Sequence, residues 1–205
     1  MSSPLISRVR DARRAFTLIE LLTVMAIIGI LAGITFGVVK GVQERAAISQ
    51  CRTELAALGT ALESYKKQYG DYPQAGSGVW TGLTSNETRL LQGLVGKRGP
   101  LGATIPGRLF LDVAKFSLNS TLDPLNATNQ DSVKFQDPWG RDYFYFYKSA
   151  GWTATSYVLL STGPDGYAFG TTATPTTTNL LNANGTIKTT AASDAGAADN
   201  IYANQ

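Results

Sequence analysis

The sequence contains no histidine and a single cysteine, Cys51, among its 205 residues. The absence of histidine excludes Ser/His/Asp and Cys/His catalysis, and any zinc site that needs imidazole. A lone cysteine cannot form an intramolecular disulfide, so a domain outside the cytoplasm would depend on packing or a metal ion for its stability. We expect Cys51 itself to be a small buried side chain.

Charge is scarce and, beyond residue 15, balanced. Only 16% of the residues are charged, with 18 basic and 15 acidic side chains. Four of the arginines and one aspartate lie within residues 1–15, so 14 basic and 14 acidic side chains remain beyond them. The balance gives no general argument for binding to nucleic acid or to acidic substrates.

One long apolar run is present near the N-terminus. Residues 16–39, FTLIELLTVMAIIGILAGITFGVV, contain a single charge, Glu20. An α-helix of this length crosses a bilayer core of roughly 30 Å. Because basic flanks of such segments stay in the cytoplasm, Arg8, Arg10, Arg13 and Arg14 predict a cytoplasmic N-terminus, with the bulk of the chain on the other side.

Three ordinary interpretations compete for this segment. A cleaved secretory signal would have a shorter apolar core, followed by a small-residue cleavage site. A twin-arginine export signal, suggested by Arg13 and Arg14, fits poorly with a glutamate inside the apolar region. A plain signal anchor would leave Glu20 unpaired in the membrane, at a cost of about 2.5–3.5 kcal/mol. Cleavage after Ala15 would instead free the α-amino group of Phe16 to pair with Glu20 of a neighbouring copy.

Residues 14–22, RAFTLIELL, resemble the class III signal of type IV prepilins and pseudopilins. The resemblance implies that a prepilin peptidase cuts between Ala15 and Phe16 and methylates the new N-terminus. It also implies that Glu20 guides the docking of subunits into a filament. The residue before the cut is normally glycine in this family, whereas alanine stands at position 15 here.

Beyond Lys40 the helical pattern becomes amphipathic. Apolar residues recur alternately three and four positions apart, which predicts one continuous helix with a domain packed against one face. The helix should end at Gly70, because Asp71, Tyr72 and Pro73 follow it. The apolar stripe consists of Ile48, Cys51, Leu55, Leu58, Leu62, Tyr65 and Tyr69. Charged residues expected on the other faces are Glu44, Arg45, Arg52, Glu54, Glu63, Lys66 and Lys67.

The middle of the chain is less regular. Residues 84–87, TSNE, predict a capping box that starts a short helix extending to about Val95. Residues 96–130 are expected to form loops and short helical turns, with 109–111 and Val113 returning to the core.

Two strands are predicted after residue 136. Residues 137–140, DPWG, are typical of a tight turn. The aromatic run at 143–147 predicts a strand whose hairpin partner is 157–160, with the turn near 149–151. We expect these aromatic side chains to pack rather than to stack on a ligand.

A second resemblance concerns the C-terminal part. The DPWG turn, the tyrosine-rich strand, residues 161–166 (STGPDG) and residues 199–201 (DNI) are similar to the major pseudopilin of type II secretion. Members of that family stack into a short periplasmic pseudopilus, and a C-terminal loop closed by calcium replaces the disulfide of many pilins. Carried over, the resemblance implies Asp165, Asp199 and the Thr162 carbonyl as metal ligands. Asp194 or Asn200 could replace or join Asp199.

Together these patterns predict an α+β, pilin-like chain in which a long N-terminal helix packs on a small antiparallel sheet. We expect a leader at 1–15, a transmembrane and assembly helix at 16–39, and an extracytoplasmic domain at 40–205. The expected location is the inner membrane, crossed once, with a periplasmic globular domain. Expected partners are the prepilin peptidase, identical and related pseudopilins, and an inner-membrane assembly platform.

Other functions remain as alternatives. A type IV pilin for adhesion, motility or DNA uptake would share the N-terminal signal. A DNA-binding competence pilin would need a basic patch, for which Lys97, Arg98 and Arg108 are the local candidates. An enzyme is not expected, because no nucleophile with a base and no distinctive pair of carboxylates stands out.

Overall fold

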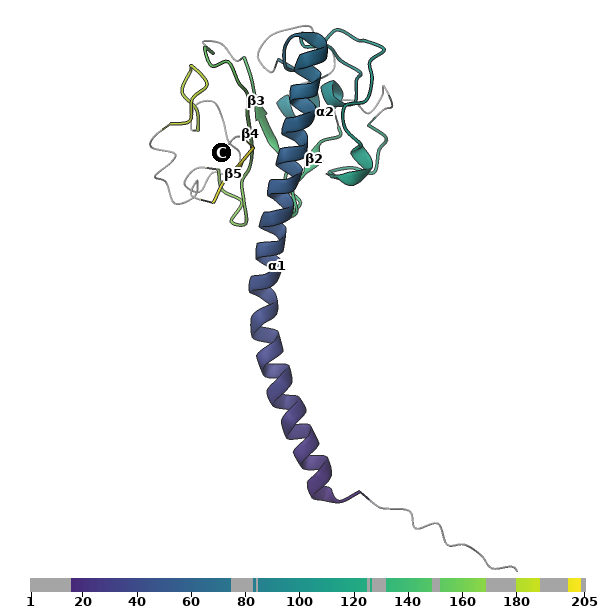
Figure 1. Ribbon diagram of the computed structural model, residues 1–205, viewed down its shortest axis with the longest axis vertical. Helices are drawn as coiled ribbons and strands as arrows, with labels where there is room; N and C mark the ends of the chain where they lie inside the picture. The colour runs from purple at the N-terminus through teal and green to yellow at the C-terminus, as the bar shows by residue number, and fades with distance from the viewer. Residues whose placement is uncertain are drawn as a thin grey trace, which may run out of the picture. The chain divides into compact units, whose positions relative to one another are not determined.

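Figure 1 shows the computed structural model of the chain. Its contacts separate into two compact units, residues 1–43 and 44–205. The structure describes residues 16–74, 83, 85–124, 126, 132–148, 152–168, 180–188 and 199–203, and for 34–40 it describes the backbone alone. The predicted turn at 149–151 lies outside the described residues.

The first and longest element is α1, Leu18–Tyr69, whose second half belongs to the larger unit. Its apolar stripe is buried as expected: Cys51, Leu55, Leu58, Leu62 and Tyr65 are at most 1% exposed. The helix ends where the sequence predicts, and Gly70 follows in the left-handed conformation with φ +82°. In Figure 1, α2 and the strands β3, β4 and β5 gather around this half of α1.

Glu54 departs from the expected pattern, because its carboxylate is buried rather than solvent-facing. The Tyr143 hydroxyl donates to its Oε2 at 2.7 Å, and the Gln50 amide donates to its Oε1 at 2.8 Å. Burial of a carboxylate is tolerated where its lone pairs are satisfied in this way. The sequence could not show this because Tyr143 lies 89 residues further along the chain.

The short helix α2, Asn86–Leu94, forms where the sequence predicts, but its cap lies one residue later than the TSNE pattern indicates. Ser85 is the N-cap, and its Oγ accepts from the Thr88 amide at 3.2 Å. Two adjacent hydroxyl residues, Thr84 and Ser85, made the position ambiguous. Val95 closes the helix, and its backbone amide donates to the Leu91 carbonyl.

Three strands form the main sheet in the order β3–β4–β5: β3 is Phe144–Phe146, β4 is Val158–Ser161 and β5 is Ile201–Tyr202. The predicted pairing of β3 with β4 is confirmed, antiparallel, with Tyr145 opposite Leu159. β5 adds a third antiparallel strand, with Ser161 opposite Ile201. The α+β expectation, a helix packed on a small antiparallel sheet, is confirmed.

The 96–130 region contains a short helical turn, as the sequence predicts, and in addition a short strand that was not expected. A 3-10 turn, η1 (Val113–Lys115), precedes β1 (Ser117–Leu118), which pairs with β2 (Phe135–Gln136). Phe110, Leu111 and Val113 pack against the core as expected, but Leu109 is 48% exposed. Strands of two residues are too short to produce a recognisable alternation.

Side chains alternate between the two faces of the main sheet. Tyr143, Tyr145 and Tyr147 join the core around α1, whereas Phe146 and Leu160 form a second cluster on the other face. Leu180 and Leu181 cover this second face, with Ile187 and Trp152 beside them. The expectation that the aromatic strand packs is therefore confirmed, and residues 180–188 provide part of the cover.

Candidate functional site

The N-terminal candidate site lies at the first turn of α1. The Thr17 amide and hydroxyl both donate to Glu20 Oε2 at 2.9 Å, and the Glu20 amide donates back to Thr17 Oγ1 at 3.3 Å. A carboxylate at this position satisfies free amides of the helix and opposes its dipole favourably. Thr17 is a site residue that the sequence analysis missed, although hydroxyl residues before a glutamate are a known capping pattern. Ala15 lies outside the described residues.

Apolar side chains cover the rest of this first segment. Phe16 is 83% exposed and Leu18 84%, and their larger apolar neighbours as far as Leu31 are at least half exposed. An apolar surface of this extent on an isolated subunit indicates that something else covers it. Among the described residues, which leave out the side chains of 34–40, no helix has an apolar stretch long enough to cross a membrane.

The C-terminal candidate site brings together two aspartates that lie 34 residues apart. The Asp165 amide donates to Asp199 Oδ2 at 3.0 Å. Gly163 adopts φ +66°, and a Cβ there would lie 2.3 Å from the Asp199 carbonyl oxygen. Only glycine fits this approach. Of the predicted ligand residues, Thr162, Asp165 and Asp199 therefore meet in one loop region.

The site has oxygen atoms that lack partners. Asp199 Oδ1, Asn200 Oδ1 and Thr162 Oγ1 are buried and accept or donate no hydrogen bond within the described part of the chain. Burial raises the pKa of the Asp199 carboxyl, and the negative charge of Asp165 raises it further. A hard cation would satisfy such oxygens and offset this repulsion, so the donors present fit calcium.

Carboxylates alone do not complete a metal site here. Across the residues that the structure describes, no three Asp, Glu, Cys or His side chains gather closely enough to hold a metal ion. Calcium takes six to eight oxygens, so carbonyl, amide and hydroxyl oxygens or water would have to supply most of them. Asn200, raised in the sequence analysis as an additional ligand, donates from its amide nitrogen to the Ala168 carbonyl at 3.0 Å. Asp194 lies outside the described residues.

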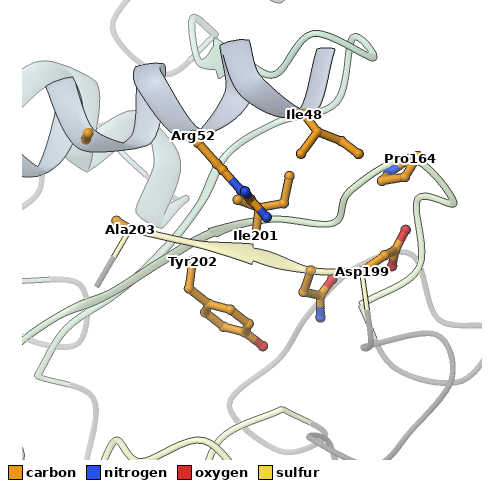
Figure 2. Close-up of a pocket in the computed structure, with 9 residues that line it drawn as sticks. Ile48, Arg52, Pro164, Asp199, Ile201, Tyr202 and Ala203 are labelled. Atoms are coloured by element: carbon orange, nitrogen blue, oxygen red, sulfur yellow. The ribbon is translucent and has the colours of Figure 1, made fainter. Parts of the chain in front are cut away.

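A groove of about 610 Å³ adjoins this loop. Its walls are α1 on one side and the loop with β5 on the other, as Figure 2 shows. Arg52 extends from α1 toward Ile201 of β5, while Pro164 and Asp199 stand at the loop end of the groove. The groove thus combines an exposed cation, a carboxylate and apolar walls.

The candidate basic patch is partly used inside the fold. Arg98 Nη1 donates to the Gly102 carbonyl at 3.1 Å and to Thr104 Oγ1 at 2.9 Å. The Arg108 guanidinium lies 5.9 Å from the centre of the Phe110 ring. These contacts give both arginines a structural role.

Residues 10–36 match the family model of the prokaryotic N-terminal methylation motif. With the long first helix and the antiparallel sheet, this match defines the class: proteins with a prepilin-type N-terminus.

Relatives specify the family. The chain is 30% identical over 159 residues to type II secretion system core protein G of Escherichia coli (strain K12), covering 78% of this chain and 87% of that protein. It is 28% identical over 153 residues to core protein G of Vibrio cholerae, covering 74% of this chain and 82% of that protein. The chain belongs to the core protein G family of type II secretion systems, which confirms the resemblance to the major pseudopilin.

A type IV pilin is also similar over a shorter range. The type IV major pilin protein PilA of Myxococcus xanthus is 44% identical over 70 residues, which cover 33% of this chain and 32% of that protein. No solved structure matches the chain.

Proposed function

We propose that this chain is a structural subunit of a type II secretion pseudopilus and has no enzymatic role. The observation that carries the proposal is the identity to core protein G over most of both chains, together with the methylation motif at residues 10–36. Subunits of this kind would stack into a helical filament that supports protein secretion.

Processing is the first step of the proposed function. A prepilin peptidase cuts between Ala15 and Phe16 and methylates the new amino group. Phe16 is 83% exposed, and Glu20 stands one helical turn further along. The freed amine of one subunit then pairs with Glu20 of its neighbour, which gives this charge a role in docking on the inner-membrane assembly platform.

Membrane anchoring is the second part of the proposed function. Residues 16–39 would hold the subunit in the inner membrane before assembly, with the basic leader in the cytoplasm and the globular unit in the periplasm. The exposed apolar side chains of Leu18, Ile19 and Leu22 support this proposal, because lipid or neighbouring helices would cover them.

Calcium binding is the third part of the proposed function. We place the ion beside Asp165 and Asp199, with the Thr162 carbonyl as a further ligand. The unpartnered buried oxygens of Asp199, Asn200 and Thr162 support the site, as does the short separation of the two carboxylate-bearing segments. Bound calcium would tie β5 to the loop after β4 in a chain without a disulfide.

The function is tested by deleting the gene in its own bacterium and comparing the secreted proteins with those of the parent strain. Loss of a set of secreted enzymes, restored by the wild-type gene, is the expected result. Unchanged secretion with a loss of surface motility or DNA uptake would replace this proposal with the type IV pilin alternative, which the similarity to PilA favours. A neighbouring retraction ATPase gene would point the same way.

A further inference from the structure

We propose that the turn at 137–141 positions the loop at 163–166, and that Asp137, Ser161 and Arg141 are positioning residues for the cation site. The inference rests on the proposed calcium site and adds to it a set of residues that donate no ligand. The sequence placed Asp137 in a tight turn and Ser161 in the STGPDG segment, and it gave no role to Arg141.

Asp137 organises the turn. It is 1% exposed, and its Oδ1 accepts from the Trp139 amide at 3.0 Å and from the Arg141 amide at 2.9 Å. Its own amide donates to the Arg141 carbonyl at 2.7 Å, and its carbonyl accepts from the Gly140 amide at 2.9 Å. The carboxylate is therefore held rigidly, with Oδ2 left to face β4.

Ser161, at the end of β4, connects the turn to the loop. Its hydroxyl donates to Asp137 Oδ2 at 2.6 Å, a short bond to a buried carboxylate. The same Oγ accepts from the Gly163 amide at 3.1 Å. Because the hydroxyl proton is directed to Asp137, a lone pair is oriented toward Gly163.

Arg141 holds Gly163 at its carbonyl. Its Nη2 donates to the Gly163 carbonyl, and its guanidinium lies against Gly166, where a Cβ would approach Nη1 to 2.6 Å. Gly163 thus has hydrogen-bond partners at both its amide and its carbonyl. Both partners, Ser161 and Arg141, are themselves hydrogen-bonded to the Asp137 carboxylate.

Gly163 in turn touches Asp199. Its α-carbon packs so closely on the Asp199 carbonyl that no side chain fits, and the next bond along the loop joins the Asp165 amide to Asp199 Oδ2. The position of Gly163 therefore sets the separation of the two carboxylates. Outer residues that orient metal ligands typically change metal affinity by about 10- to 100-fold when they are altered.

The test uses the full chain in detergent and two variants, Ser161→Ala and Arg141→Gln. Asp142→Asn is the matched control, because Asp142 adjoins the turn but pairs with Lys134 at 3.0 Å on the partly exposed surface. Calorimetric titration with calcium chloride should show both variants binding at least about tenfold more weakly than wild type. The control should bind as wild type does.

Hydrogen exchange measured in chelator separates this inference from the calcium proposal. Amides of 163–166 and 199–203 should exchange faster in both variants than in wild type and the control. If wild type binds no calcium, the calcium proposal fails, and the exchange rates still decide whether the turn positions the loop. Unchanged exchange in both variants, or in Arg141→Gln if Ser161→Ala does not fold, would overturn the inference whatever the calcium affinity.

Discussion

Glu20 accepts two hydrogen bonds from Thr17 of its own chain, so its carboxylate is already partly satisfied before any neighbour arrives. The remaining oxygen is available to a second chain. The proposed pairing with the Phe16 amine would therefore add to the helix cap and need not replace it.

Glu20→Leu should leave membrane insertion intact or improved, since a carboxylate within a membrane helix costs up to about 2.5–3.5 kcal/mol, the cost at the helix centre. Filament formation should be lost, because the charge that pairs with the neighbouring amine is gone. Sheared-filament yield and membrane fractionation measure the two effects separately. Thr17→Val is the control: it removes the hydroxyl bond but keeps the carboxylate, and should still assemble. Wild-type filament yield from Glu20→Leu would show that the proposed pairing is wrong.

Ala15→Leu should block processing, because the residue before the cut is normally glycine and a branched side chain would not fit where a methyl group does. The expected product is an uncut precursor that keeps its basic leader. Intact-mass analysis of the membrane fraction measures this. Ala15→Gly provides the control and should be cut at least as fully as wild type. A mature N-terminus other than Phe16 in the wild-type protein would contradict the proposed cleavage site.

At the scale of elements, Asp71 connects the end of α1 to the end of β3. Its carboxylate accepts from the Tyr147 hydroxyl at 2.6 Å, from the Tyr72 amide at 2.9 Å and from the Lys148 ammonium. Burial opposes its charge, but the bonds from Lys148 and Tyr147 prevail and hold the pKa of Asp71 below its usual 3.8. This stabilisation is complete at neutral pH and is lost as the pH falls through the lowered pKa of the folded-state carboxyl.

Asp71→Asn should therefore destabilise the globular unit by about 1–2 kcal/mol at pH 7, the loss of charged hydrogen bonds discounted for partial exposure. The difference from wild type should shrink at acidic pH, once the pH falls through the lowered pKa of the wild-type carboxyl and that carboxyl takes up its proton. Urea unfolding at both pH values measures it. Asp112→Asn, which loses only an exposed pair with Lys115, should have little effect at either pH. A constant difference across the range would exclude this role of the Asp71 charge.

The elements that could be predicted are those with a long pattern. The stripe from Ile48 to Tyr69 has enough periodic positions to fix a helix and its buried face, and the aromatic run at 143–147 is long enough to indicate a strand. The strands β1, β2 and β5 have two residues each, too few to show an alternation of apolar and polar side chains. Similarly, Asp165 and Asp199 could be proposed as metal ligands from the resemblance. The Ser161–Asp137 hydrogen bond could not, because it joins residues 24 positions apart and no local sequence pattern encodes such a contact.

At the scale of the whole molecule, the proposed calcium ion should act on the stability of the entire globular unit, residues 44–205. An ion that binds only the folded state at a hundredfold excess over its Kd contributes about 2.7 kcal/mol. For a unit of this size that corresponds to a rise in Tm of about 5–10 °C.

Melting curves of a fragment lacking the first 40 or so residues should therefore shift down with chelator and recover with calcium, but less with magnesium. Magnesium demands a tighter octahedral geometry and keeps its water. Asp165→Asn with Asp199→Asn should abolish the shift, and Asp112→Asn should not. Equal melting curves with and without chelator, after any co-purified metal is ruled out, would remove calcium and leave the loop held by packing.

Cys51 lies on the inner face of α1 with 0% of its surface exposed, and burial raises the pKa of its thiol. Reagents that attack thiolates should therefore ignore it while the protein is folded and modify it only after denaturation. The natural chain can thus serve, without any further change, as a background with no accessible thiol. Pairs of cysteines placed at exposed positions such as Arg52 and Lys67 would report only on contacts between subunits, so disulfide trapping could chart how copies adjoin one another in living cells.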